Sequence, residues 1–207
     1  MAGDSTVAAC PPEEYPMSGW GAVLAAFLDE TDTVMNFAKG GATTESFISE
    51  GLWGELLKEL EPENLVLIQF GHNDQKQPAL LAPDGGYTYR LAGFLADVRS
   101  RGALPVLCTS VERCWFEDGR LVPSHGAYPQ AVRALAAREN VPVIDLTVFS
   151  AWLYEFLGED AAPSLFAEGD RTHFCIRGAS DIASYVARAL RAYTGRDALL
   201  PPRGLNL

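Results

Sequence analysis

The sequence is short of positive charge. Its 207 residues include 16 Lys and Arg against 27 Asp and Glu, a formal net charge of −11. A protein that binds nucleic acid needs a basic surface to displace the counterions of the phosphate backbone, so this balance argues against a nucleic-acid partner. With 48% hydrophobic residues, the chain is still apolar enough to fold around a core. Its length fits one domain over residues 1–207, with residues 195–207 as an irregular tail.

The sequence also lacks a long apolar run. No stretch approaches the roughly 18 consecutive apolar residues of a transmembrane helix, so we expect no membrane partner. Residues 1–5 show neither the basic start nor the apolar segment of a secretory signal. We therefore expect a cytoplasmic protein, unless a leader has been removed.

Cysteine and histidine are few, and their spacing does not suit metal binding. The chain has four Cys and three His, without a Cys-x-x-Cys pair or zinc-ligand spacing. We therefore expect no metal site and free thiols in a reducing compartment. A Cys108–Cys114 bridge fits the spacing but not that context.

Short apolar runs alternate with longer helical patterns along the chain. Runs over 33–37, 64–70, 104–109 and 141–145 predict strands, and the second is apolar almost throughout, as in a strand covered on both faces. This alternation predicts βαβ units and a parallel sheet with right-handed crossovers. An Asp-Gly pair between apolar flanks predicts a β-hairpin over 114–122. Helical patterns occupy residues 18–29, 50–60, 87–101, 128–138, 147–157 and 179–193.

Four polar segments lie near predicted strand ends or just before a predicted helix. Residues 3–6 precede the first helix, residues 39–41 follow the run over 33–37, residues 71–74 follow the strongest strand, and residues 170–173 precede the last helix. Each alone has an ordinary structural explanation: a helix cap, a turn, an Asx-turn, or a structural His with a nearby Asp.

Together the four segments predict an acyl-transfer site, because ligand sites of parallel sheets form at the carboxyl ends of the strands. Ser5 would be the nucleophile. Asp170 would hold Nδ1 of His173, which leaves Nε2 as the base. The N–H of Gly41 and the amide of Asn73 would stabilise the oxyanion.

In these segments the sequence resembles the SGNH (GDSL-type) hydrolase superfamily, named for blocks that carry Ser, Gly, Asn and His. Within it, the resemblance is to the rhamnogalacturonan acetylesterase group, carbohydrate esterase family twelve. The resemblance extends over nearly the whole chain, to about Tyr193. The matching motifs are Gly3-Asp4-Ser5-Thr6, Asn36-x-Ala38-x-x-Gly41, the segment from Ile68 to Asp74, Asp170-x-Thr172-His173-Phe174, Gly19-Trp20-Gly21, Ser46-Phe47 and Ile144-Asp145-Leu146.

The resemblance implies a three-layer α/β/α sandwich with a flavodoxin-like parallel sheet of about five strands in the order 2-1-3-4-5. It implies a serine esterase that removes O-acetyl groups from carbohydrate through an acyl-enzyme, without a cofactor. Ser5, His173 and Asp170 are then the catalytic residues. The Ser5 N–H, the Gly41 N–H and Asn73 form the oxyanion hole, with Gly40 replacing Gly41 if the loop register differs by one.

The sequence departs from this group in two places. The group commonly has Arg-Ser after the oxyanion glycine, whereas this chain has Ala42-Thr43, so a possible anchor for a carboxylate is missing. Only Met1 and Ala2 stand where relatives have several apolar residues. The first strand is therefore either a stub or begins upstream of this chain.

The sequence indicates the class of substrate and partner but not their identity. An acetylated oligosaccharide or another small ester is the expected partner, and a homo-oligomer is also compatible with the sequence. A protein of charge −11 would repel a polyanionic glycan unless its cleft were locally basic. Two alternatives stay open: a short-chain esterase, thioesterase or lysophospholipase of the same superfamily, and a catalytically silent glycan-binding protein. Candidates for substrate contact are Asp4, Lys39, His125, Arg113 and Trp115, with Arg171 as a further cation, whereas His72 is expected to be structural.

Overall fold

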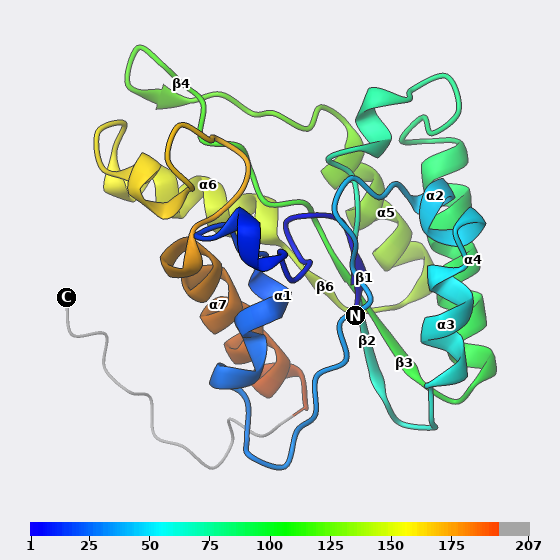
Figure 1. The fold of residues 1–207 in the computed structure, drawn as a ribbon. Coiled ribbons are helices and arrows are strands. Elements are labelled where there is room, and N and C mark those ends of the chain that lie inside the picture. Colours follow the sequence, from blue (N-terminus) through cyan, green and yellow to red (C-terminus); the bar gives the residue numbers. More distant parts are fainter. Residues whose placement is uncertain (195–207) are drawn as a thin grey trace.

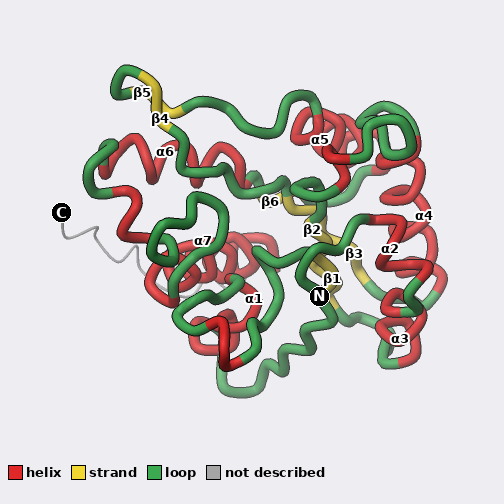
Figure 2. Tube along the Cα trace, turned by 45° about the horizontal axis from the view of Figure 1, so that its top comes forward, coloured by secondary structure: helices red, strands yellow, loops and turns green. Residues whose placement is uncertain are grey.

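A parallel β-sheet lies between two layers of helices in the computed structural model, which describes residues 1–194 (Figures 1 and 2). The expected irregular tail, residues 195–207, lies outside the described residues. The sheet has four strands in the order β1-β2-β3-β6, and every neighbouring pair is parallel. The strands are β1 (Ala2–Gly3), β2 (Leu65–Gln69), β3 (Leu104–Cys108) and β6 (Val143–Ile144).

Side chains of the strands alternate between two hydrophobic cores. Val66, Ile68 and Phe70 belong to one core, whereas Leu67 between them belongs to the other. This alternation is the period of two that a β-strand imposes on its side chains, and it explains the nearly continuous apolar run. The first core packs against α2 (Thr44–Ser49), α3 (Leu52–Lys58), α4 (Gly86–Ser100) and α5 (Tyr128–Glu139). The second packs against α1 (Trp20–Val23), α6 (Leu146–Leu157) and α7 (Ile176–Thr194).

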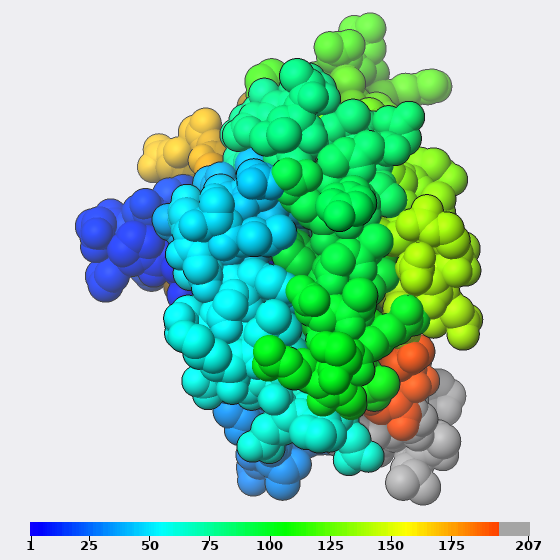
Figure 3. Space-filling model, turned by 90° about the vertical axis from the view of Figure 1, so that its right-hand side faces the viewer, coloured from blue at the N-terminus to red at the C-terminus, as the bar shows by residue number. Residues whose placement is uncertain are grey.

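Figure 3 shows the outer face of the first layer, which is formed largely by residues coloured cyan to green. Single 3₁₀ turns complete the elements: η1 (Pro12–Glu14), η2 (Leu24–Phe27), η3 (Asp74–Lys76) and η4 (Ala162–Leu165).

The strand predicted over residues 33–37 is absent, so the sheet has four strands rather than about five. The segment is nevertheless held along β1. The Phe37 N–H donates to Met1 O at 3.0 Å, and the Lys39 N–H donates to Gly3 O at 3.1 Å. It thus occupies the place of strand 2 in the expected order 2-1-3-4-5. Because β1 is two residues long, it offers too few partners for a regular ladder.

The predicted hairpin is confirmed. Strand β4 (Phe116–Glu117) pairs antiparallel with β5 (Arg120–Leu121). Asp118 and Gly119 both have positive φ, 49° and 75°, as a two-residue type I′ turn requires. In Figure 1 this hairpin projects beyond α6.

Helix α2 was not predicted, although the sequence carries its start signal. Thr43 and Ser46 form a capping box: Thr43 Oγ1 accepts from the Ser46 N–H at 3.0 Å, and Ser46 Oγ accepts from the Thr43 N–H at 2.9 Å. The helix begins directly after Gly41 and Ala42, so the cap anchors the end of that loop.

All four cysteines are unpaired, so no Cys108–Cys114 bridge forms. Cys108 and Cys114 are buried, whereas Cys10 and Cys175 are half-buried. Burial raises the pKa of the Cys108 thiol to about 12, which makes it a poor nucleophile. Within residues 1–194, no helix is long and apolar enough to cross a membrane.

Candidate active site

Ser5, His173 and Asp170 form a continuous chain of contacts. Ser5 follows β1, and the other two residues lie in the loop before α7. His173 Nε2 lies 3.0 Å from Ser5 Oγ, and His173 Nδ1 lies 2.7 Å from Asp170 Oδ2. With Nδ1–H donating to the carboxylate, Nε2 is left as the acceptor for the Ser5 hydroxyl proton. The structure therefore brings the three predicted catalytic residues together.

The loop that contains Asp170 stabilises the ionised form of its carboxylate. Its Oδ1 accepts from the N–H groups of Thr172 at 2.6 Å and His173 at 2.9 Å. Partial burial opposes ionisation, but the hydrogen bonds from the His173 ring and from the two N–H groups outweigh it, so the pKa of Asp170 lies below its ordinary value. An ionised Asp170 fixes the ring orientation of His173 at neutral pH.

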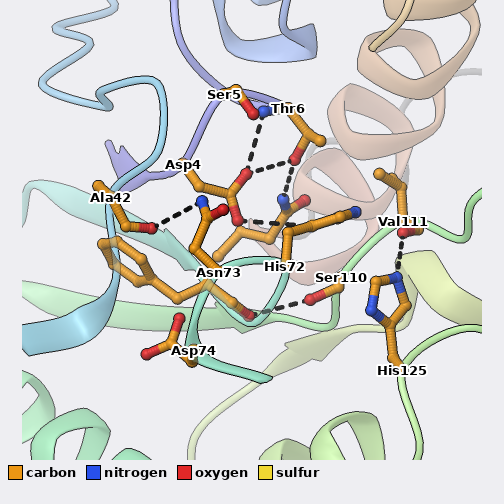
Figure 4. A network of polar contacts seen from close by, with 12 residues as sticks. Asp4, Ser5, Thr6, Ala42, His72, Asn73, Asp74, Ser110, Val111 and His125 are labelled. Carbon is orange, nitrogen blue, oxygen red and sulfur yellow. Dashed lines mark hydrogen bonds and ion pairs between the residues drawn. The ribbon is translucent and has the colours of Figure 1, made fainter. Parts of the chain in front are cut away.

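Asp4 holds the loop that carries Ser5. Its side chain is fully buried, and Oδ1 accepts from the Thr6 N–H at 3.0 Å and from Thr6 Oγ1 at 2.8 Å (Figure 4). Gln69 Nε2 donates to Thr6 Oγ1 at 2.5 Å, and Trp20 Nε1 donates to Gln69 Oε1 at 2.9 Å. The expected substrate contact of Asp4 conflicts with this burial, because the carboxylate points into the protein.

The loop around Gly41 is attached to the same elements. Asn36 Nδ2 donates to Val7 O at 2.9 Å, just beyond the Ser5 turn. Gly41 has a φ of +76°, a conformation that favours glycine. No acceptor within residues 1–194 takes the Gly41 N–H, so it is available to a ligand. Gly40 has no positive φ, which favours Gly41 as the residue that needs a glycine.

Asn73 joins this loop to the end of β2. Its Nδ2 donates to Ala42 O at 3.1 Å, and its Oδ1 accepts from Lys76 Nζ at 2.9 Å. In Figure 4 the amide points toward the segment with Asp4 and Ser5. One amide hydrogen is committed to Ala42, and the second is left for a ligand. Sequence reasoning missed Lys76, although the spacing Asn73-x-x-Lys76 places both residues on one helical turn.

Asp74 forms a second link between the two loops. It is fully buried, and its Oδ1 accepts from the Thr44 N–H at 2.9 Å and from Thr44 Oγ1 at 2.7 Å. Burial and the nearby charge of Asp4 outweigh the Thr44 donors, so the pKa of Asp74 is raised to about 6. Sequence reasoning gave this residue no role of its own.

His72 and His125 pack together beneath the site. Both are buried, with ring centroids 4.5 Å apart and an interplanar angle of 77°. His72 Nδ1 lies 3.4 Å from Asp4 Oδ2, a favourable electrostatic approach rather than a well-formed hydrogen bond. Burial raises the pKa of Asp4, but His72 and the Thr6 donors outweigh it, and the net shift is downward. The expectation that His72 is structural agrees with its position.

The expected substrate role of His125 conflicts with its burial. Its Nε2 lies 2.7 Å from Val111 O, to which it donates. Gln75, with its amide nitrogen toward His125 Nδ1 and its oxygen toward Arg113, completes the arrangement. Burial, together with His72 and Arg113, lowers the pKa of His125 to about 3, so the ring is neutral at physiological pH.

Three predicted cations also make contacts within the protein. The Arg113 guanidinium donates to Ser124 O at 3.3 Å and to His72 O at 3.4 Å. Lys39 pairs with Glu50 on the surface. Arg171 donates to Cys114 O at 3.3 Å but remains exposed.

Trp115 is 57% exposed at the base of the hairpin, as a sugar-stacking residue would be. With Arg113 and Ser124 it lines a shallow cleft of about 320 Å³. A larger cleft, about 470 Å³, lies at the amino ends of the strands, lined by Met1, Leu65 and others, on the side opposite to the triad. Among the residues that the structure describes, no group of three or more His, Cys, Asp or Glu could hold a metal ion.

Residues 1–180 match the model of the GDSL-like Lipase/Acylhydrolase family. The chain belongs to this family. It is 42% identical to the rhamnogalacturonan acetylesterase RhgT of Bacillus subtilis, over 92% of this chain and 88% of that protein. It is 34% identical to YesY of the same organism, described as a probable rhamnogalacturonan acetylesterase, over 92% of this chain and 91% of that protein. The crystal structure of YxiM from Bacillus subtilis superposes with a TM-score of 0.84 at 27% identity, over 93% of this chain and 55% of that one.

Proposed function

We propose that this protein is a carbohydrate acetylesterase that uses Ser5 as its nucleophile. The observation that carries the proposal is the chain of contacts from Asp170 Oδ2 through the His173 ring to Ser5 Oγ, at 2.7 and 3.0 Å. Family membership and the similarity to a rhamnogalacturonan acetylesterase support the reaction class. Ser5 and His173 are both half-buried, so an ester can reach them from solvent.

In the first half-reaction, His173 Nε2 takes the Ser5 proton while Ser5 Oγ attacks the acetyl carbonyl carbon. The negative charge then forms on the former carbonyl oxygen. The Ser5 N–H, the Gly41 N–H and the second Asn73 amide hydrogen stabilise this oxygen, and one such donor is typically worth roughly 100- to 1,000-fold in rate. His173 then protonates the leaving sugar oxygen, and the bond from carbon to that oxygen breaks.

In the second half-reaction, water replaces the sugar. His173 takes a proton from water, the resulting hydroxide oxygen attacks the acetyl-Ser5 carbonyl, and the same donors hold the oxyanion. His173 returns the proton to Ser5 Oγ, and acetic acid leaves and gives its remaining proton to solvent as acetate. Each proton that moves to or from Ser5, the sugar oxygen and the attacking water passes through His173, so the cycle needs only protein groups and water.

The charges around the site bear on the choice of glycan. Of the four cations expected to make the cleft basic, Lys39 is paired with Glu50, Arg113 is half-buried and bound to carbonyl groups, and His125 is buried and neutral. Arg171 keeps an exposed charge beside the catalytic loop. The proposed substrate is therefore an acetylated oligosaccharide with few carboxylates close to the ester. Such an oligosaccharide could come from pectin, as the names of the relatives suggest, or from another acetylated glycan.

The decisive experiment combines two variants with a substrate panel. Ser5→Ala and His173→Ala are each expected to lose at least about 1,000-fold in kcat on p-nitrophenyl acetate while folding normally. A fluorophosphonate probe is expected to label the native protein but not Ser5→Ala. Wild-type turnover by Ser5→Ala would refute Ser5 as the nucleophile. No labelling of the folded native protein would instead favour a catalytically silent glycan-binding protein.

The substrate panel tests the carbohydrate assignment separately. Acetate release is measured on acetylated pectin, xylan and mannan oligosaccharides, and acetyl esters are compared with octanoyl esters. We expect acetyl esters to be preferred. A preference for octanoyl esters would instead indicate a lipolytic or thioesterase activity on the same triad.

A further inference from the structure

Lys76 folds back onto the amide of Asn73. It ends the short helix η3, and its backbone N–H donates to Asn73 O at 3.0 Å. Its side chain follows the same path, and Nζ lies 2.9 Å from Asn73 Oδ1. Asp74, between the two in sequence, is fully buried and bonded to Thr44, so the turn itself is anchored in the core.

Both ends of the Asn73 amide are thereby fixed. Nδ2 donates to Ala42 O, and Oδ1 accepts from the Lys76 ammonium. A rotation of the amide by 180° would bring its NH₂ group against the ammonium and its oxygen against the Ala42 carbonyl, and both contacts are repulsive. The remaining amide hydrogen therefore keeps one direction, and the amide group points toward the segment with Asp4 and Ser5 (Figure 4).

We propose that Lys76 is a positioning residue of the oxyanion hole. It holds the Asn73 amide in the donating orientation and draws electron density toward Oδ1, which strengthens Nδ2 as a donor to the oxyanion. The proposal rests on the proposed function, because it requires that Asn73 stabilise the oxyanion. Lys76 is exposed, so solvent weakens the interaction, and its contribution is smaller than that of Asn73 itself.

The first test is a set of single variants on p-nitrophenyl acetate. Because this ester is small and neutral, its hydrolysis does not depend on a contact between the substrate and residue 76. Lys76→Met is expected to lower kcat about tenfold with KM unchanged, because the donor is misaligned without loss of substrate binding. Lys76→Arg, which still donates to Oδ1, is expected to keep at least about half of kcat. Lys58→Met, which removes an exposed lysine paired with Glu55 on α3, is the matched control and is expected to leave kcat unchanged.

The second test is a double-mutant cycle with Asn73→Ala. If Lys76 acts through the amide, Lys76→Met lowers kcat by less than about twofold once Asn73 is alanine. An equal tenfold loss in both backgrounds would overturn the proposal, because Lys76 would then act independently of Asn73. Wild-type kcat in Lys76→Met, or a raised KM with unchanged kcat, would overturn it as well.

Thermal unfolding of each variant separates loss of positioning from loss of folding, and Lys76→Arg keeps the test informative if Lys76→Met is unstable. Failure of the proposed function has a different signature. In that case Ser5→Ala would retain activity. If only the positioning role of Lys76 is wrong, Ser5→Ala is inactive and Lys76→Met keeps its activity.

Discussion

His173 Nε2 lies 3.0 Å from Ser5 Oγ, although 168 positions separate the two residues in sequence. The segment that leads into the first residue of α1 connects them. The Ser18 N–H donates to Phe174 O at 2.9 Å, next to His173, and the Trp20 N–H donates to Thr6 O at 2.8 Å, next to Ser5. One short stretch of backbone therefore sets the separation of nucleophile and base, and the packing of α1 on α7 supports it.

Asp170→Asn is expected to reduce kcat by roughly 1,000- to 10,000-fold with little change in fold. The Asn oxygen can still accept from the N–H groups that now bind Oδ1. Its NH₂ group then faces Nδ1 of His173 and stabilises the tautomer that is protonated on Nε2, which cannot accept the Ser5 proton. Steady-state kinetics on p-nitrophenyl acetate and a thermal melt check this prediction. A loss of less than about tenfold would show that Asp170 does not determine the tautomer.

Gly41→Ala and Gly40→Ala form a matched pair. At both positions a Cβ would have open space, but only Gly41 has a positive φ, +76°. Alanine at position 41 is therefore strained, the loop rotates, and its N–H leaves the oxyanion position. We expect kcat to fall at least about tenfold in Gly41→Ala and by less than about twofold in Gly40→Ala. The opposite ranking would make Gly40 the oxyanion residue.

Asp74 predicts an unusual pH dependence of stability. Its pKa is about 6 in the folded protein and about 3.9 when unfolded, so between these values the folded state binds more protons. The free energy of unfolding therefore falls as pH rises from about 4 to above 6, by roughly 3 kcal/mol from this group. Asp74→Asn cannot ionise and keeps an acceptor for Thr44. Urea unfolding at pH 4.5, 5.5 and 7 is expected to show the variant gaining stability over the native protein as pH rises. Parallel curves would contradict a raised pKa.

Gln69→Leu tests the buried network under the nucleophile. Gln69 accepts from Trp20 Nε1 and donates to Thr6 Oγ1, and it is 1% exposed. Leucine leaves the Trp20 N–H buried without an acceptor and removes the donor to Thr6 Oγ1, which is expected to cost roughly 1–3 kcal/mol of unfolding free energy. Urea unfolding measures this loss. Gln77→Leu, on the surface, serves as control and is expected to change stability by less than about 0.5 kcal/mol.

Much of the architecture could be predicted from local sequence alone. The apolar runs of β2 and β3 are strong because both faces of those strands are buried. The Asp118-Gly119 pair predicted its hairpin because both residues tolerate a positive φ. The prediction of a strand over 33–37 was wrong because a regular strand needs a partner strand of sufficient length, and its neighbour β1 has only two residues. The sequence of 33–37 carries no information about that length.

Local sequence was enough to predict an α/β fold with a parallel sheet and to propose Ser5, Asn73, Asp170 and His173 as site residues, because their types and their places after strands or before a helix point to one chemistry. Which polar residues face solvent could not be predicted, because it follows from contacts between distant segments of the folded chain. Asp4 and His125 belong to the interior, whereas Lys76 lies against Asn73. Exposure and pairing depend on segments far apart in the chain, such as the contact of Asp4 with His72, and local pattern carries no information about them.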